Sequence, residues 1–407
     1  MVVARHWAAD RQVSMDGILF FILVLVAIAA LFRIDFVFYL VYLLFGAYLL
    51  SRWWLERSLS GVRVQHEYES RAFVGDHVRV CLRVCNDSWL PVPWLRIHES
   101  LPIHLISPNF YRAVISLLPG QERVLEYELH CRHRGYYALG PLLVSSGDPL
   151  GIRTVERDQD CSEALTVYPR VFGLEQLGLQ AQSPFGEIAS RQRLMEDPAR
   201  IIGVRPYVES DSLRHIHWKT TATTGTLQVK RFEPAISVES MVLINLCRAD
   251  YTVNRYVAAS ELAIEAAASI ANHLIDRRQT VGLGTTGFDP LNPEQGAAYL
   301  PPHKGRAHLM QMLDLLGRIE LAEEGQFEPL LRQVRQHLGW GGTAIVITPD
   351  LDPALEATLL LVRRQGIHLL VVLVDPHGPP REVRARMEQV GVPCHVLWRE
   401  EDLDVWR

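Results

Sequence analysis

The sequence predicts a membrane α-hairpin, an antiparallel β-sandwich and a doubly wound α/β domain within one chain. Three observations predict them: two long apolar runs near the start, alternating apolar and polar residues in the middle, and apolar strands separated by amphipathic helices at the end. At 407 residues, the chain is long enough for two or three domains. Its composition, 48% hydrophobic and 21% charged, is typical of a folded protein.

The net charge and the spacing of the cysteines exclude some classes of function. The formal net charge of −5 argues against nucleic acid as the main partner, because nucleic-acid-binding domains are usually strongly basic. The six cysteines lack the close pairing of zinc ribbons and thioredoxin-like motifs, so we interpret them as reduced thiols, with a disulfide or metal role as the alternative. No cofactor is predicted.

Two apolar runs separated by three residues predict a pair of transmembrane helices. The runs are residues 17–32 and 36–50, with the charged turn 33–35 between them. Each is slightly shorter than the roughly 20 residues that cross about 30 Å of hydrocarbon, and flanking residues or local thinning can make up the difference. We therefore assign residues 1–16 to an N-terminal segment and 17–52 to a two-span hairpin. A buried hairpin in a soluble fold is the alternative.

The flanking residues predict the orientation of this hairpin. Basic residues that precede the first run and follow the second are Arg5, Arg11, Arg52, Arg57 and Arg63. The positive-inside rule then places both termini and the soluble domains in the cytoplasm, in a multi-pass protein of the inner (plasma) membrane. Trp53 and Trp54 stand where an interfacial aromatic anchor is expected. An outward-facing protein near the cell wall is the alternative.

Residues 60–160 show the two-residue period of half-buried strands. The stretch HVRVCLRVCND alternates apolar and polar residues, and turn signals such as Pro119-Gly120-Gln121 and Gly140-Pro141 separate further strand-like runs. Short strands at this spacing predict a sandwich of immunoglobulin-like type. No catalytic motif stands out, so binding or scaffolding is the predicted role of this domain.

Residues 236–407 alternate apolar strands with amphipathic helices. The predicted strands are residues 241–247, 280–285, 343–348, 368–374 and 394–398. This alternation predicts a buried, mainly parallel sheet with helices on both faces. A ligand crevice is then expected at the carboxyl ends of the strands, where the strand order reverses. Because no Gly-rich phosphate loop follows the first strand, we expect no nucleotide there.

The segment 211–234, DSLRHIHWKTTATTGTLQVKRFEP, concentrates charged and aromatic residues. Its pattern predicts a helix that Asp211 caps and Gly225 ends. On that helix Asp211, Arg214 and Trp218 would share one face, which makes a carboxylate–guanidinium–indole stack available.

Three interpretations of this segment follow, in order of preference: a structural junction, a surface for an anion or a protein partner, and a catalytic site. The catalytic interpretation is the weakest because no recognisable nucleophile or acid accompanies the histidines. A binding surface would be formed by Arg205, Arg214, His215, His217, Lys219, Lys230 and Arg231.

Several motifs resemble those of the bacterial and archaeal "domain of unknown function 58" proteins. The most specific is GVRPYVESDSLRHIHWKT (203–220); HRGYYALGP, GDPLGI, LTVYPRV and LPPHKGRAHLMQML are also similar. Thr223 and Ser210 depart from the family, which usually has arginine and glycine there. The signature residues that match are Arg205, Tyr207, Asp211, Arg214, Trp218 and Lys219.

The resemblance implies a domain order and a partner. It places a linker with the family signature at residues 161–235 and a von Willebrand factor A-like domain at residues 236–407. It also implies a MoxR-type AAA+ ATPase as the working partner, alongside the lipid bilayer that the hairpin requires.

The resemblance also locates a degenerate metal site. Many von Willebrand-type domains carry Asp-x-Ser-x-Ser at the end of the first strand and bind a divalent cation there; this chain has Asn245, Cys247 and Ala249. An amide, a thiol and a methyl group remove most of the hard oxygen donors that magnesium prefers. Asp350 and Asp352 could supply carboxylates from the neighbouring strand end. We predict no metal.

These features together predict a membrane-anchored, non-enzymatic adaptor or scaffold. It would work with the ATPase in complex assembly or in cell-envelope physiology. The alternative is a metal-dependent binding protein or enzyme that uses the strand-end crevice.

Overall fold

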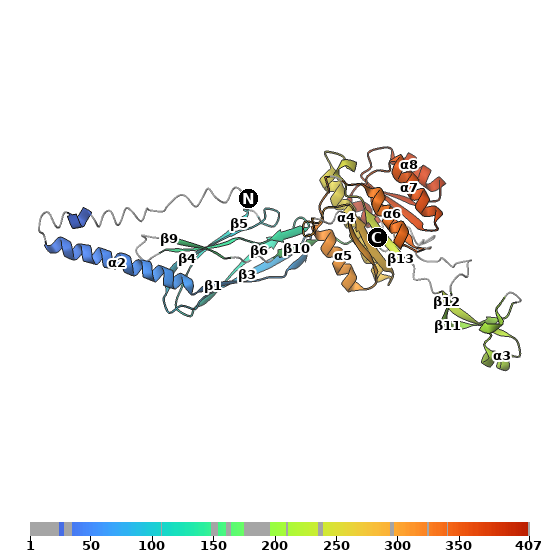
Figure 1. The fold of residues 1–407 in the computed structure, drawn as a ribbon, viewed down its shortest axis with the longest axis horizontal. Helices are drawn as coiled ribbons and strands as arrows, with labels where there is room; N and C mark the ends of the chain where they lie inside the picture. Colours follow the sequence, from blue (N-terminus) through green and yellow to red (C-terminus); the bar gives the residue numbers. More distant parts are fainter. Residues whose placement is uncertain are drawn as a thin grey trace. The chain divides into compact units, whose positions relative to one another are not determined.

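The computed structural model describes most of the chain and divides it into two compact units, Met1–Tyr168 and Pro169–Arg407 (Figure 1). The described residues are 24–27, 35–106, 108–147, 154–159, 164–174, 196–208, 211–234, 239–293, 297–323, 325–339 and 341–405.

Helix α2 (Asp35–Ser60) begins the first unit. Its stretch Phe36–Ser60 is long and apolar enough to cross a membrane, and only 11% of its most apolar window is buried within the protein. Such exposure is unusual for the core helix of a soluble domain, because a helix that is apolar all round is normally buried. Of the other predicted span, 17–32, only residues 24–27 are described, and they are helical; the rest of that span lies outside the described residues.

Helix α2 extends well beyond the predicted end of the hairpin at residue 52. Leu55, Ser58 and Leu59 in its last turns are buried, and the two leucines belong to the hydrophobic core of the following β-strands. The helix therefore continues from its exposed apolar part into a folded domain without a linker.

The rest of the first unit consists of short strands. They are β1 (Val62–Glu67), β2 (Arg71–Phe73), β3 (His77–Asn86), β4 (Val92–Ser100), β5 (Phe110–Leu117), β6 (Glu122–His130), β7 (Gly135–Ala138), β8 (Leu142–Gly147), β9 (Thr154–Gln159) and β10 (Ala164–Tyr168).

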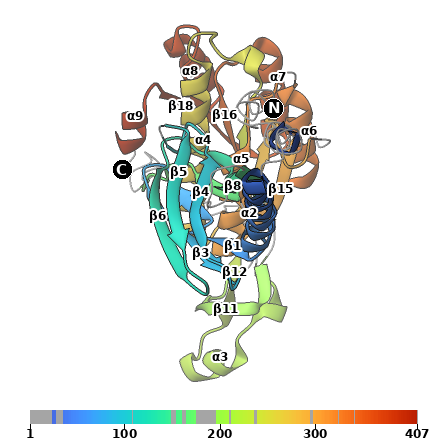
Figure 2. The same ribbon diagram turned by 90° about the vertical axis from the view of Figure 1, so that its left-hand side faces the viewer.

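These strands form an antiparallel sheet in the order β1-β3-β6, an antiparallel sheet in the order β5-β4-β8-β9, and a small sheet in the order β2-β10-β7 (Figure 2). Buried residues from both antiparallel sheets share one hydrophobic cluster. Strand β10 pairs with β2 and β7, although it lies in the segment 161–235 that the sequence predicts as a linker. An immunoglobulin-like order of connections stays a prediction.

A buried polar cluster joins the two antiparallel sheets. Glu99 on β4 is fully buried, and its Oε1 lies 3.0 Å from Nε2 of His66 on β1. Tyr127 on β6 donates a hydrogen bond of 2.9 Å to Oε2. Burial and the nearby Glu99 carboxylate raise the pKa of Tyr127, so its hydroxyl keeps the proton that it donates. A buried carboxylate is destabilising unless it is paired, so the cluster favours one register of the sheets.

The second unit contains an α/β domain. Its elements are β13 (Glu239–Ile244), α4 (Tyr256–Asp276), β14 (Thr280–Thr285), β15 (Ala298–His303), α5 (Arg306–Arg318), α6 (Phe327–His337), β16 (Thr343–Thr348), α7 (Pro353–Arg364), β17 (His368–Val374), α8 (Pro380–Gln389), β18 (Cys394–Leu397) and α9 (Glu400–Val405).

The six-stranded sheet has the order β15-β14-β13-β16-β17-β18. All neighbouring strands are parallel except the edge strand β15. Helices α4 and α5 lie on one side of the sheet, and α6, α7 and α8 lie on the other (Figure 1). The predicted doubly wound fold is confirmed, and the order reverses at β13, so a crevice is expected at its carboxyl end.

Strand β15, helix α6 and the short helix α9 are missing from the sequence-based prediction. Strand β15 contains two consecutive prolines, which suit an edge strand because proline cannot donate to a ladder. Helix α6 carries buried Phe327, Leu330, Leu331 and Val334 at three- and four-residue spacing, so its signal was present in the sequence.

The Glu99 cluster gives a stability prediction. Glu99→Ala should lower the free energy of unfolding by about 3–5 kcal/mol, because it leaves the buried partners of this carboxylate unsatisfied. Chemical denaturation of the detergent-solubilised full chain measures this change. The control is Glu128→Ala, which removes an exposed carboxylate from β6 and should have little effect. Equal effects of the two variants would contradict a structural role for the cluster.

Candidate functional site

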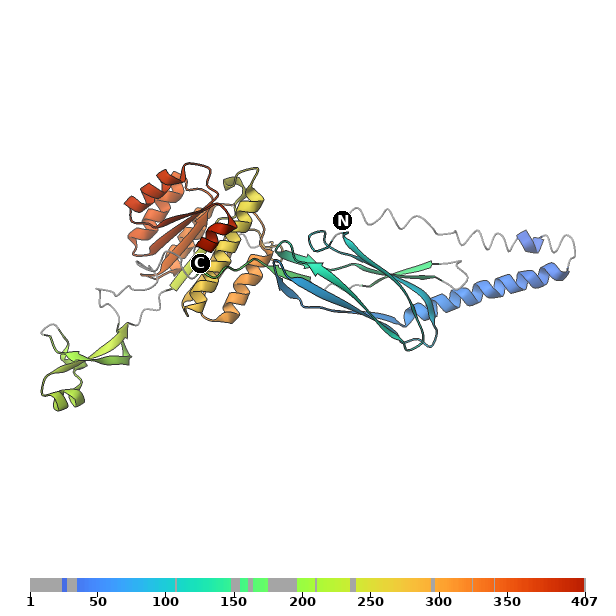
Figure 3. The same cartoon turned by 180° about the vertical axis from the view of Figure 1, so that it is seen from behind.

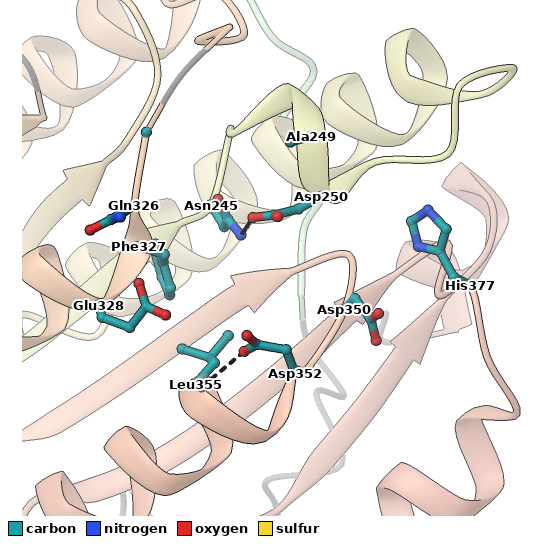
Figure 4. A pocket seen from close by; sticks show the side chains of 11 residues that line it. Asn245, Ala249, Asp250, Gln326, Phe327, Glu328, Asp350, Asp352, Leu355 and His377 are labelled. Carbon is teal, nitrogen blue, oxygen red and sulfur yellow. Dashed lines mark hydrogen bonds between the residues drawn. The ribbon is translucent and has the colours of Figure 1, made fainter.

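Strands β13 and β16 end at a pocket of about 430 Å³ (Figure 4). This is the carboxyl edge of the sheet at the reversal of strand order, where the fold predicts a ligand crevice. The lining residues are Asn245, Ala249, Asp250, Gly325, Gln326, Phe327, Glu328, Asp350, Asp352, Leu355 and His377.

Asn245, the first residue after β13, has its side-chain amide engaged by the protein itself. Its Nδ2 donates to Oδ2 of Asp250 at 2.7 Å and to Oγ1 of Thr348 at 3.3 Å. Its Oδ1 accepts from the backbone N–H of Cys247 at 3.1 Å. Asn245 is therefore a buried connection between the ends of β13 and β16, rather than a donor left free for a ligand.

The residues beside Asn245 are also committed to internal contacts. The Cys247 side chain is buried, and its Sγ donates to the carbonyl of Gly325 at 3.4 Å. The Tyr251 hydroxyl donates to the carbonyl of Asn245 at 2.6 Å. Burial, with the nearby Asp250, raises the pKa of Tyr251, so this hydroxyl stays protonated at neutral pH.

Four carboxylates surround the pocket: Asp250, Glu328, Asp350 and Asp352. Asp250 follows β13, Glu328 lies on α6, and Asp350 and Asp352 both lie in the loop between β16 and α7 (Figure 4). Asp352 caps α7 by accepting from the N–H of Leu355 at 2.8 Å, and Asp350 accepts from the N–H of Leu351 at 2.8 Å. None of the four forms an ion pair with a basic side chain that the structure describes.

The pocket combines a buried apolar wall with an acidic rim. Phe327 and Leu355 are buried, whereas Asp250, Asp350 and Asp352 are exposed. Within the described part of the chain, no group of three or more His, Cys, Asp or Glu side chains is placed to hold a metal ion. The lining is chemically suited to a basic side chain with an aliphatic stem, such as lysine or arginine.

The family signature forms a separate small structure. Strands β11 (Glu196–Pro206) and β12 (Gln228–Pro234) pair as an antiparallel ribbon, and helix α3 (Trp218–Thr224) lies in the connection between them (Figure 3). Ile216 and Val229 are both buried and pair through an isolated bridge. We call residues 203–230 the signature ribbon.

A bidentate ion pair stabilises the segment that connects the two strands of the signature ribbon. Arg205 donates from Nη1 and Nη2 to the two carboxylate oxygens of Asp211 at 2.6 and 2.5 Å. Asp211 also accepts from the N–H of Val208 at 3.0 Å. Tyr207, which is half-buried, donates its backbone N–H to the carbonyl of Leu227. Arg205, Tyr207 and Asp211 thus fix the local backbone.

The continuous helix predicted after Asp211 is wrong. A short 3-10 turn (Leu213–His215) is followed by Ile216 in an extended conformation, and α3 begins only at Trp218. His217 caps α3 by accepting at Nδ1 from the N–H of Thr220. Ile216 is buried against β12 in an extended conformation, and this packing interrupts the helix that local spacing favours. Arg214 and Trp218 consequently lie on different helical turns, and the predicted stack with Asp211 is replaced by the Arg205–Asp211 pair.

Gly225 ends α3 as predicted, with φ of 68°, a left-handed conformation that favours glycine.

Trp218 is 69% exposed, so it is not a core residue of a junction. Other exposed large apolar residues of the signature ribbon are Val204, Val208, Leu213 and Leu227. Arg214 and Lys219 are also exposed, whereas His215, His217 and Lys230 are half-buried. The side chain of Arg231 lies outside the described residues.

The comparisons with known proteins bear on this same region. The model of the family described as "Protein of unknown function DUF58" matches residues 203–384, from the signature ribbon to α8. Over this segment the chain is similar to the DUF58 family. The matched segment contains both the signature ribbon and the strand-end pocket.

A curated relative is uncharacterized protein YeaD of Bacillus subtilis (strain 168), 24% identical over 275 residues. The alignment covers 67% of this chain and 65% of YeaD, slightly less than two thirds of the relative's length.

Two solved structures share local similarity. A von Willebrand factor type A protein from Catenulispora acidiphila is 11% identical, with a TM-score of 0.32, and the match covers 44% of this chain and 42% of that one. The CARDB domain of the PF1109 protein from Pyrococcus furiosus is 18% identical, with a TM-score of 0.20, and the match covers 26% of this chain and 91% of that domain.

Sequence reasoning found some of the pocket residues and missed others. Asn245, Asp350 and Asp352 line the pocket as the strand ends predicted, whereas Cys247 is buried beside it. Asp250, Glu328 and His377 were missed. Asp250 and His377 follow β13 and β17 closely, so the rule of strand carboxyl ends could have identified them; Glu328 arrives on the unpredicted α6.

The pocket geometry predicts weak metal binding. Calorimetric titration of the full chain with magnesium, manganese or calcium should show no site tighter than about 100 μM, which corresponds to roughly 5.5 kcal/mol. The internal bonds of Asn245 are the physical reason. Asp350→Ala is the matched variant. Tighter binding that disappears in Asp350→Ala would contradict this prediction and would favour the metal-dependent alternative.

Proposed function

We propose that this protein is a membrane-anchored adaptor that binds protein partners through its signature ribbon and its strand-end pocket. The observation that carries the proposal is the exposure of Trp218, Leu213 and Val208 on a segment whose backbone is fixed by the Arg205–Asp211 pair. Large apolar side chains that stay exposed on a fixed backbone are typical of interaction sites.

The charge distribution supports two complementary kinds of contact. The signature ribbon presents Arg214 and Lys219 beside its apolar residues, which suits a partner surface with carboxylates. The pocket presents Asp250, Asp350 and Asp352, which suits a partner segment with lysine or arginine. Electrostatic complementarity of this kind accelerates encounter and selects partners.

The proposed partner is a MoxR-type AAA+ ATPase, and its support is the family resemblance. The adaptor would contribute binding rather than bond cleavage, because Asn245 and Cys247 are engaged in internal hydrogen bonds at the strand ends. The process served would be assembly of protein complexes or cell-envelope physiology.

The proposed location is the inner (plasma) membrane, with a two-span hairpin and with both termini and the soluble domains in the cytoplasm. Helix α2 supports the anchor by its length and exposed apolar surface, and the arginines that flank the two apolar runs support the orientation.

Substitution of Trp218 tests the adaptor proposal. Trp218→Ala should change the free energy of unfolding by less than about 0.5 kcal/mol, because the side chain is mostly exposed. The same variant should recover much less ATPase in pull-downs from solubilised native membranes. Trp398→Ala, which removes another exposed indole from the second unit, is the control and should recover the wild-type amount.

Two results would count against this adaptor. Repeated pull-downs of the wild-type protein that contain no AAA+ ATPase would remove the proposed partner. Equal recovery by Trp218→Ala and wild type would remove the signature ribbon as its docking surface.

A further inference from the structure

The end of helix α2 is joined tightly to the β3–β4 loop. A Cβ placed on Gly61 would lie 2.6 Å from the backbone nitrogen of Ser88, so no larger residue fits without movement. The Asp87 N–H donates to the Gly61 carbonyl at 2.9 Å, and Arg63 pairs with Asp87 at 2.7 Å. The loop therefore has a fixed position relative to the helix end.

Two tryptophans of α2 contact this same loop. Nε1 of Trp54 donates to the carbonyl of Pro91 at 3.2 Å. The rings of Trp53 and Trp89 lie 5.9 Å apart between centroids, with an interplanar angle of 59°. Trp89 is nevertheless 65% exposed. The loop thus places a second exposed indole, that of Trp89, beside Trp53 of helix α2.

The β5–β6 turn belongs to the same end of the domain. Nδ2 of Asn86 donates to the carbonyls of Leu90 and Leu118, at 2.9 and 3.2 Å, and so ties the loop and the turn together. Leu118 is 64% exposed. We call the two tryptophans Trp53 and Trp89, together with the neighbouring aliphatic residue Leu118, the aromatic rim.

The position of the aromatic rim along α2 coincides with the expected surface of a bilayer. Most large apolar side chains from Phe36 to Trp53 are exposed, although Val41 is buried, and the residues of α2 that join the hydrophobic core of the β domain begin at Leu55. From Phe36 to Trp53 an α-helix rises about 26 Å at 1.5 Å per residue. This length is close to the thickness of a hydrocarbon core, about 30 Å.

We propose that the aromatic rim rests in the interfacial layer of the bilayer that α2 crosses. This proposal rests on the proposed membrane anchor. The occupant is lipid rather than a protein because the rim is continuous with the exposed apolar surface of α2 and is fixed to it by the Gly61–Ser88 contact. Tryptophan is enriched at the depth of the headgroups. The β domain then contacts the membrane through three chain segments, which restricts its tilt.

Site-directed fluorescence tests this contact. A polarity-sensitive dye is attached to Trp89→Cys or Leu118→Cys in the full chain, which is reconstituted in phosphatidylcholine vesicles. A spin-labelled phosphatidylcholine then quenches dyes that touch lipid. Dye-treated wild type provides the background from the native cysteines. Both substituted residues are exposed, so the fold should tolerate the changes.

Two further positions make the result interpretable. Ile103→Cys is the matched control: it is 65% exposed and lies beyond Ser100, at the far end of β4 from the β3–β4 loop. Strand β4 has nine residues, which span roughly 30 Å at 3.4 Å each. Leu43→Cys, in the exposed part of α2, reports on the anchor itself.

We expect quenching at residues 89 and 118 to be several-fold greater than at residue 103 and comparable to that at residue 43. Quenching at residue 43 alone would overturn the aromatic rim and leave the anchor intact. Absence of quenching at residue 43 as well would overturn both.

Discussion

The close packing of helix α2 on the β domain is the constraint on which the proposed anchoring role depends. Leu55 and Leu59 complete the hydrophobic cluster of two antiparallel sheets, and Gly61 allows the chain to turn against Ser88. Because no linker separates the apolar helix from this core, the orientation of the β strands is tied to that of the proposed anchor. A flexible tether would instead leave the orientation of the β domain undefined.

A second constraint acts at the strand ends of the α/β domain. Asn245 stands where the family resemblance implies a metal-binding aspartate, and its amide satisfies Asp250, Thr348 and the Cys247 backbone. The site is thereby closed by internal hydrogen bonds, while the outer carboxylates face the pocket. An inner amide held by internal hydrogen bonds and an acidic rim suit the proposed direct recognition of a basic partner, which needs no bridging cation.

The sequence predicted most of the α/β domain because its strands are continuous apolar runs and its helices have a clear period, as in β16, β17 and α4. It failed in the signature ribbon because local spacing cannot reveal that Ile216 pairs with Val229 across the ribbon, or that Arg205 is the partner of Asp211. The exposure of Trp218 could not be predicted either, because a tryptophan at this spacing is compatible with a buried core and with a binding surface. The pocket was only partly predicted because topology, not sequence proximity, brings Glu328 beside Asp350.

Alkaline carbonate extraction of native membranes tests the anchor most directly. This treatment strips proteins held by charge or by peripheral contacts but leaves membrane-spanning helices in the bilayer. If α2 crosses the hydrocarbon, the full chain should remain in the membrane pellet after the wash. Recovery of the intact chain in the supernatant would contradict the account, because the exposed apolar surface of α2 would then require a different occupant.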